Sequence, residues 1–185
     1  LQNTGSFASV ACSGAKIKDI TSISADDYKN QDPQANGKLD DSYDDEIFNQ
    51  FLPGYRGQSM FVKNNQPRIM TMSMGGNDVG FSAIIKKCVM PSIYENTCYK
   101  YYEDRKSLVN TVNAQYPRLV DMYSDLLRAS PDSRLYVIGY PELAMANGNC
   151  SLNVGLNNDE IIFSNQLVGY LNSVIEMAAN KAGAY

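Results

Sequence analysis

The 185-residue sequence predicts an α/β protein in which helices cover both faces of a parallel sheet, because strand-like and helix-like segments alternate three times along the chain. Residues 69–74 are apolar or β-favouring and run directly into Gly75-Gly76, as a buried parallel strand does where it turns sharply. Residues 133–141 have the same character, begin after a Pro-Asp turn and end at Gly139 and Pro141.

The first strand is expected over residues 7–11, where it leads into small residues and Gly14. A short amphipathic helix follows over residues 17–23, since Ile17, Ile20 and Ile23 are three apart. Both predictions rest on short segments.

Residues 25–50 differ in composition from the rest of the chain and predict an exposed acidic excursion. Asp32-x-Gln34-x-Asn36-Gly37 within it distantly resembles the start of a calcium loop, although Tyr43 stands where a bidentate Glu is needed. A solvated loop is the favoured interpretation, and cation binding stays open as the alternative.

The remaining segments predict helices. Residues 59–64 form a helical turn or two, and residues 79–89 form a short buried helix. Residues 104–130 have a long helical pattern that Pro117 must kink or split. A final helix is capped by Asn157, with Glu160 at the capping-box position, and Gly183 ends it.

Composition predicts one globular domain over residues 1–185, with 44% hydrophobic residues and a net charge of −4. This charge argues against nucleic acid or an anionic membrane surface as a partner, because both require clustered Lys and Arg. No apolar run reaches the ~20 residues of a membrane span. The N-terminal residues lack the parts of a signal peptide, so any such signal is expected upstream.

The cysteines indicate the compartment. Cys88 and Cys98 flank Pro91-Ser92 in a predicted loop, and we expect them to form a disulfide, which implies a secreted or extracytoplasmic protein. Two free structural thiols are the alternative. Cys12 and Cys150 are not expected to be linked to each other. Four Cys without Cys-x-x-Cys spacing and without any His predict no zinc site.

The segment Gly75-Gly76-Asn77-Asp78 is the strongest candidate site. Asn77 would present an uncharged amide donor at the carboxyl end of a parallel strand, where open α/β sheets bind ligands. An ordinary strand-to-helix turn, with Asp78 capping the next helix, is the alternative interpretation.

Two segments together resemble a known family. Ala11-Cys12-Ser13-Gly14-Ala15 resembles the second sequence block of the SGNH (GDSL-type) esterases and lipases, and Gly75-Gly76-Asn77-Asp78 resembles the third. Gly139-Tyr140-Pro141 also resembles the turn after the following strand. The resemblance implies a three-layer α/β/α sandwich with the flavodoxin-like strand order 2-1-3-4-5. The chain then supplies the second, third and fourth strands and lacks the first and last.

The same resemblance implies site residues. Gly14 would contribute its backbone N–H, and Asn77 its side chain, to an oxyanion hole. The Gly-Asp-Ser block with the nucleophile and the Asp-x-x-His block have no counterpart, and the sequence contains no His. Ser13 and Ser73 lie close to the two motifs, but neither sits in a Gly-x-Ser-x-Gly elbow.

The implied activity is hydrolysis of an acyl ester through a serine acyl-enzyme, with no metal or organic cofactor. The implied partners are a small-molecule, lipid or acylated-sugar ester and the missing flanking segments of the parent protein. The alternative is a non-catalytic binding or interaction module on a degenerate form of the fold. The absence of His favours this alternative, and the presence of both Gly14 and Asn77 argues against it.

Overall fold

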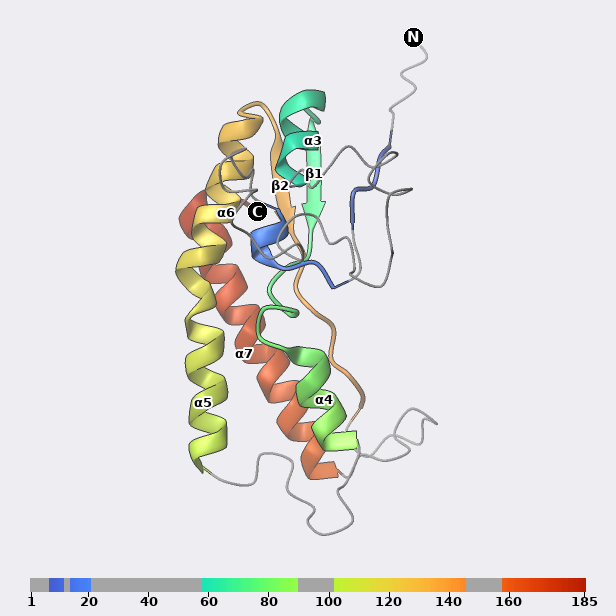
Figure 1. Cartoon of the computed structure of the whole chain (residues 1–185), viewed down its shortest axis with the longest axis vertical. Helices are drawn as coiled ribbons and strands as arrows, with labels where there is room; N and C mark the ends of the chain where they lie inside the picture. The colour runs from blue at the N-terminus through green and yellow to red at the C-terminus, as the bar shows by residue number, and fades with distance from the viewer. Residues whose placement is uncertain (1–6, 12–13, 21–57, 90–101, 146–157) are drawn as a thin grey trace, which may run out of the picture.

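The computed structural model describes residues 7–11, 14–20, 58–89, 102–145 and 158–185 (Figure 1). The predicted acidic excursion and Cys12, Cys98 and Cys150 lie outside these residues. The elements are, in chain order, η1 (Ile17–Asp19), α3 (Gln58–Asn65), β1 (Ile69–Met72), α4 (Phe81–Val89), α5 (Tyr102–Asn113), α6 (Gln115–Ala129), β2 (Arg134–Val137) and α7 (Asn158–Ala182).

The predicted α/β class and its parallel sheet are confirmed. β1 and β2 pair in parallel, with Met70 opposite Leu135 and Thr71 opposite Tyr136. The far edge of β2 bonds to the last residue, since Tyr185 N–H donates to the Leu135 carbonyl at 2.9 Å and Val137 N–H donates to the Tyr185 carbonyl at 2.8 Å. These are the two hydrogen bonds that one residue of a neighbouring parallel strand would make to β2.

The strand predicted over residues 7–11 is wrong, because these residues adopt no regular secondary structure. A strand requires a hydrogen-bonded neighbour. In the described part of the chain β1 has one neighbour, which is β2. Phe7 is accordingly 92% exposed.

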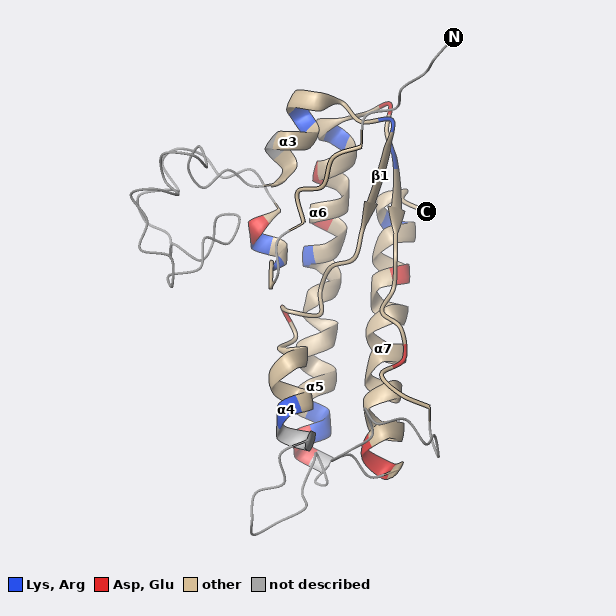
Figure 2. Ribbon diagram, turned by 90° about the vertical axis from the view of Figure 1, so that its right-hand side faces the viewer, with Lys and Arg blue, Asp and Glu red and all other residues tan. Residues whose placement is uncertain are grey.

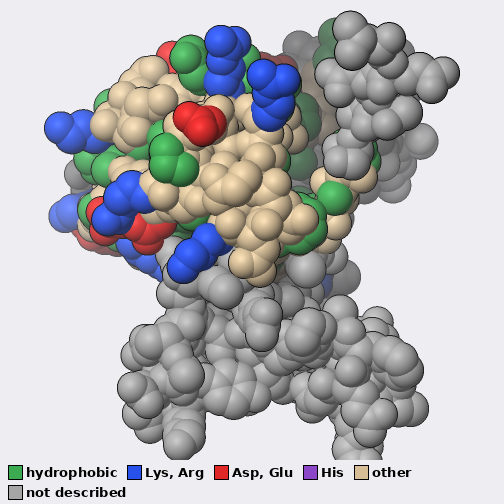
Figure 3. Space-filling view, turned by 90° about the horizontal axis from the view of Figure 1, so that it is seen from above, with side chains coloured by type: hydrophobic (Ala, Val, Ile, Leu, Met, Phe, Trp, Pro, Cys, Tyr) green, Lys and Arg blue, Asp and Glu red, His purple; other side chains and the backbone are tan. Residues whose placement is uncertain are grey.

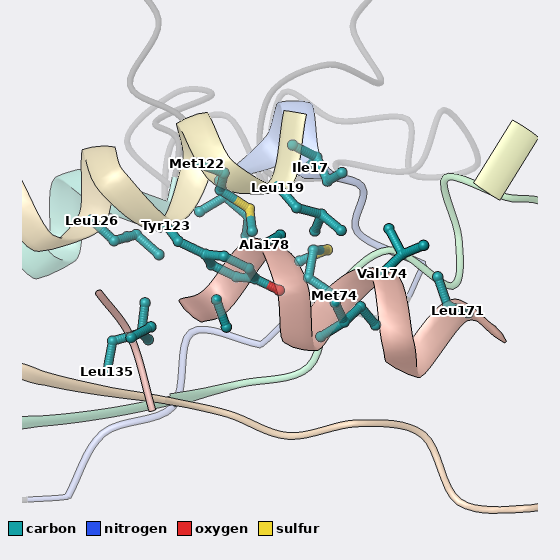
Figure 4. Packing of buried hydrophobic residues seen from close by; sticks show 14 of the residues in the cluster. Ile17, Met74, Leu119, Met122, Tyr123, Leu126, Leu135, Leu171, Val174 and Ala178 are labelled. Carbon is teal, nitrogen blue, oxygen red and sulfur yellow. The ribbon is translucent and has the colours of Figure 1, made fainter. Parts of the chain in front are cut away.

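The two faces of the sheet differ. Met70 and Leu135 are buried in a hydrophobic cluster with α6 and α7. Figure 4 shows Leu119, Met122 and Tyr123 of α6 directed toward Leu171, Val174 and Ala178 of α7, with Leu135 of β2 at the edge of this cluster. On the opposite face, Ile69 is 63% exposed within the described structure. The sheet is therefore anchored through the face that carries Met70 and Leu135.

The long helical pattern is split, as Pro117 predicted. α5 ends at Asn113 and α6 begins at Gln115, which places Pro117 in the first turn of α6. Proline is tolerated there because its missing N–H would have no intrahelical partner. α5 and α6 thus run end to end beside α7 (Figure 1).

α7 confirms the final predicted helix and ends as expected. Gly183 has φ +83°, Gly183 N–H bonds to the Asn180 carbonyl at 3.2 Å, and Ala184 N–H bonds to the Ala179 carbonyl at 2.9 Å. These two bonds define a Schellman C-cap. The cap directs the chain back onto β2, where Tyr185 pairs.

The surface is mixed in charge. α3 lies beside α6 (Figures 1 and 2). Lys and Arg are scattered over the ribbon among acidic and neutral residues (Figure 2). Seen from above, basic side chains lie at several separate places on the visible described surface, among acidic and hydrophobic ones (Figure 3). None of the described helices combines the length and apolar character that crossing a membrane would need.

Candidate active site

Gly14 and Asn77 line the same pocket, which has a volume of about 300 Å³. The remaining lining residues come from the segment after Gly14 and from the start of α4, namely Lys16, Gly80, Phe81, Ser82, Ala83 and Lys86. Gly14 has φ +72°, a backbone conformation that side chains with a Cβ rarely adopt. The structure therefore brings the two predicted oxyanion residues to one hollow of the surface.

The side chain of Asn77 is anchored on one side. Its Nδ2 donates to the Ala15 carbonyl at 2.9 Å, which ties the segment that holds Asn77 to the residue after Gly14. An amide nitrogen carries two hydrogens, so within the described part of the chain one of them is open to another acceptor. Asn77 itself is exposed, so that acceptor can arrive from solvent.

The ordinary-turn interpretation required Asp78 to cap α4, but the structure places its carboxylate elsewhere. Its carboxylate accepts hydrogen bonds from the backbone N–H of Ile17, at 3.1 Å to Oδ2 and 3.3 Å to Oδ1. Arg118 of α6 lies 3.2 Å from Oδ1, and the side chain of Asp78 is only 1% exposed. Asp78 thus fastens η1 to the turn that carries Asn77.

The start of α4 explains this difference. Val79 N–H bonds to the Gly75 carbonyl at 3.1 Å, and Gly80 has φ +71°, so residues 75–80 form a turn of their own. α4 begins only at Phe81, after Gly80 has reversed the chain. Asp78 therefore lies before the helix and faces Ile17.

Burial raises the pKa of Asp78 above its usual value of 3.8, while the Ile17 N–H and Arg118 oppose this effect. Lys16 lowers the pKa and Asp19 raises it further. Loss of solvation is therefore the dominant influence on this carboxyl.

Arg118 was not predicted as a site residue. Its signal in the sequence is weak, because a single Arg one residue after Pro117 in an amphipathic helix is normally a surface residue. Only the packing of α6 against η1 brings it to Asp78.

The other predicted residues are placed only in part. Ser73 is exposed just after β1, and Ser13 lies outside the described residues. Cys88 lies in α4, and its predicted partner Cys98 lies outside the described residues. The disulfide between them therefore stays a prediction. Within the described part of the chain, no cluster of three or more His, Cys, Asp or Glu residues could hold a metal ion.

These features define an α/β protein with a pocket at the end of a parallel strand, lined by a glycine and an amide side chain. No protein-family model matches the sequence. A curated protein, Lipase 1 of Streptomyces coelicolor, is 28% identical over 116 residues, which cover 62% of this chain and 40% of that protein. The match therefore spans two fifths of the length of this curated relative.

Two solved structures are similar. A phospholipase A1 from Streptomyces albidoflavus is 28% identical with a TM-score of 0.49, and the match covers 68% of this chain and 54% of that one. An extracellular lipase from Streptomyces rimosus is 20% identical with a TM-score of 0.48, covering 64% and 48%. The similarity to Lipase 1 agrees with the resemblance to SGNH (GDSL-type) lipases that was inferred from the segments around Gly14 and Asn77.

Proposed function

We propose that this chain carries the oxyanion half of a serine ester hydrolase site. The observation that carries the proposal is the shared pocket of Gly14 and Asn77. The Gly14 N–H and the second Nδ2 hydrogen of Asn77 would donate to the oxygen on which negative charge develops when an ester carbonyl is attacked. Donors fixed in advance stabilise that charge without reorganising during the reaction.

The anchoring of Asn77 supports this role. Its bond to Ala15 and the bonds of Asp78 to Ile17 connect the two donor segments directly. An oxyanion hole needs both donors within about 3 Å of one oxygen, so a fixed separation between the segments is a requirement of the chemistry.

In this proposal the nucleophilic serine and its histidine base come from segments outside the 185 residues, because the sequence contains no His. The sheet offers places for such segments. In the described structure β1 is unpaired on one edge, and Ile69 and Ile138 are 63% and 55% exposed. A strand beside β1 would fill the open edge of the sheet, and an element packed on the face that carries Ile69 would cover its apolar surface, whereas the outer edge of β2 already bonds to Tyr185.

The substrate class follows from the reaction: an acyl ester, for which lipids, acylated sugars and small esters are candidates. No metal or organic cofactor is needed for attack by an activated serine. A secreted location accompanies the proposal and rests on the predicted disulfide between Cys88 and Cys98.

The test compares the 185-residue chain alone with a protein in which a Gly-Asp-Ser block precedes it and an Asp-x-x-His block follows. The longer protein should hydrolyse a p-nitrophenyl ester and unfold at a higher temperature. The chain alone should show no hydrolysis above that of its Asn77→Ala variant. Turnover by the chain alone that Ser13→Ala or Ser73→Ala abolishes would show that a local serine is the nucleophile.

The competing function is a non-catalytic binding module, which the absence of His favours. The same comparison separates the two. A longer protein that folds and is more stable, yet shows no ester hydrolysis, would support the binding module.

A further inference from the structure

A tyrosine beyond β2 contacts the turn that carries Asn77. The backbone N–H of Gly76 donates to the hydroxyl oxygen of Tyr140 at 3.0 Å. Gly76 directly precedes Asn77 and is buried. A Cβ on Gly76 would lie 3.0 Å from the ring and hydroxyl of Tyr140, so the tyrosine packs against the glycine backbone without spare room.

Tyr140 is itself held by α7. Asn172 accepts a hydrogen bond from Tyr140 N–H and donates one to the Tyr140 carbonyl, both at 2.8 Å. A Cβ on the preceding Gly139 would lie 2.9 Å from the Asn172 side-chain oxygen. The Tyr140 backbone therefore has one position relative to α7, and its ring packs against the hydrophobic core.

We propose that Tyr140 and Asn172 are positioning residues for Asn77: α7 fixes Tyr140, Tyr140 fixes Gly76, and Gly76 sets the direction of the Asn77 amide. This inference rests on the proposed function, because it assigns a purpose to the direction of Asn77. Tyr140 contacts the turn at Gly76, whereas Ala15 bonds to the side chain of Asn77, so the two contacts are separate.

These contacts matter because, among the residues that the structure describes, the Asn77 amide has one anchor of its own, the bond to Ala15. One hydrogen bond allows the side chain to pivot about that bond. A second fixed point on the adjacent residue holds the backbone from which the Asn77 side chain extends, which limits where its amide can lie before charge develops.

The structural test uses the 185-residue chain labelled with ¹⁵N and the Tyr140→Phe variant. Removing the hydroxyl leaves the Gly76 N–H without its acceptor. We expect the Gly76 amide to exchange with solvent about fivefold faster or more, and the Asn77 side-chain amide resonances to shift. Tyr170→Phe is the matched control, since Tyr170 donates its hydroxyl to Asn113 at 2.6 Å elsewhere. The control should change neither signal.

A second pair of variants tests the link to α7. Asn172→Asp keeps the acceptor and loses the donor to Tyr140, and it should also speed Gly76 exchange. Asn165→Asp is its control in the same helix, because Asn165 makes the same two kinds of bond to Leu143 N–H at 3.0 Å and to the Ala144 carbonyl at 2.8 Å. Unchanged Gly76 and Asn77 signals in both Tyr140→Phe and Asn172→Asp would overturn the inference.

The catalytic consequence is read in the longer protein that carries the serine and histidine blocks. Measured well below the unfolding temperature of each protein, Tyr140→Phe should lower kcat about tenfold with KM unchanged, whereas Tyr170→Phe should leave both unchanged. If Tyr140→Phe lowers the unfolding temperature and leaves kcat unchanged, Tyr140 has a structural role only, and the positioning role is overturned. If the longer protein hydrolyses no ester while Tyr140→Phe still speeds exchange of the Gly76 amide, the proposed function is contradicted. The chain of contacts from α7 through Tyr140 to Gly76 is then supported.

Discussion

The side-chain amide of Asn77 donates a hydrogen bond to the carbonyl oxygen of Ala15 at 2.9 Å, and the next residue, Asp78, bonds to Ile17. Two segments that are 62 residues apart in the chain are thereby fastened at adjacent points.

Asp78→Ala should lower the free energy of unfolding by about 1–3 kcal/mol, because it leaves the Ile17 N–H without an acceptor. Arg118 is 45% exposed and can return to water, which limits the loss. Asp125→Ala is the control: the exposed pair that Asp125 forms with Arg128 should contribute less than about 1 kcal/mol. Urea denaturation of the three proteins measures both changes, and equal losses would contradict the fastening role.

Arg118→Gln should destabilise the protein more at about pH 7 than at about pH 3. Burial holds the folded-state pKa of Asp78 above 3.8, and removal of Arg118 raises it further. A raised carboxyl pKa contributes stability that is fully present below the unfolded pKa and is lost as pH rises through the folded pKa. The free energy of unfolding therefore falls more between about pH 3 and about pH 7 in the Arg118→Gln variant than in the unmodified protein. Denaturation at both pH values tests this, with Arg128→Gln as the control, because its exposed pair with Asp125 should give a smaller difference between the two pH values.

Gly76→Ala should destabilise by about 1–3 kcal/mol, because the new methyl would lie too close to Tyr140. Gly169→Ala provides the opposite control, since a Cβ at this position of α7 has no neighbour within 4 Å. Replacing a helical glycine with alanine in open space should stabilise by up to about 1 kcal/mol. Thermal unfolding gives both signs, and a neutral Gly76→Ala would show that the turn can move away from Tyr140.

Cys88 and Cys98 should be linked when the protein is isolated without reductant. Mass spectrometry of unreduced peptides should find one linked peptide that contains both residues, and no peptide that joins Cys12 to Cys150. Free thiols at both Cys88 and Cys98 would remove the argument for a secreted protein.

The regular elements were largely predictable from sequence, because their signals are local. The apolar run at residues 69–74 and the stop at Gly183 were confirmed as β1 and the end of α7, and Pro117 was correctly expected to interrupt a long helix. These features depend on side chains within a few residues of one another.

The features that failed or were missed depend on partners distant in the sequence. Residues 7–11 have strand-like composition, but in the described structure they have no strand beside them to complete a ladder. Asp78 was expected at a helix N-terminus and instead reaches Ile17, because Gly80 delays the start of α4. Asn165 and Asn172, seven residues apart on α7, gave a usable signal: two amides repeated at helical spacing beside an apolar stripe.

The most direct measurement of the central claim is the effect of Asn77→Ala on ester hydrolysis by the longer protein that supplies the serine and histidine. If Asn77 donates to the developing oxyanion, kcat should fall by about 10²–10³-fold with little change in KM. Asn65→Ala is the matched control, since Asn65, at an exposed position of α3, also donates its side-chain amide to a backbone carbonyl, that of Phe61 at 2.9 Å. An Asn77→Ala variant that hydrolyses the ester as fast as the Asn65→Ala variant would contradict the claim.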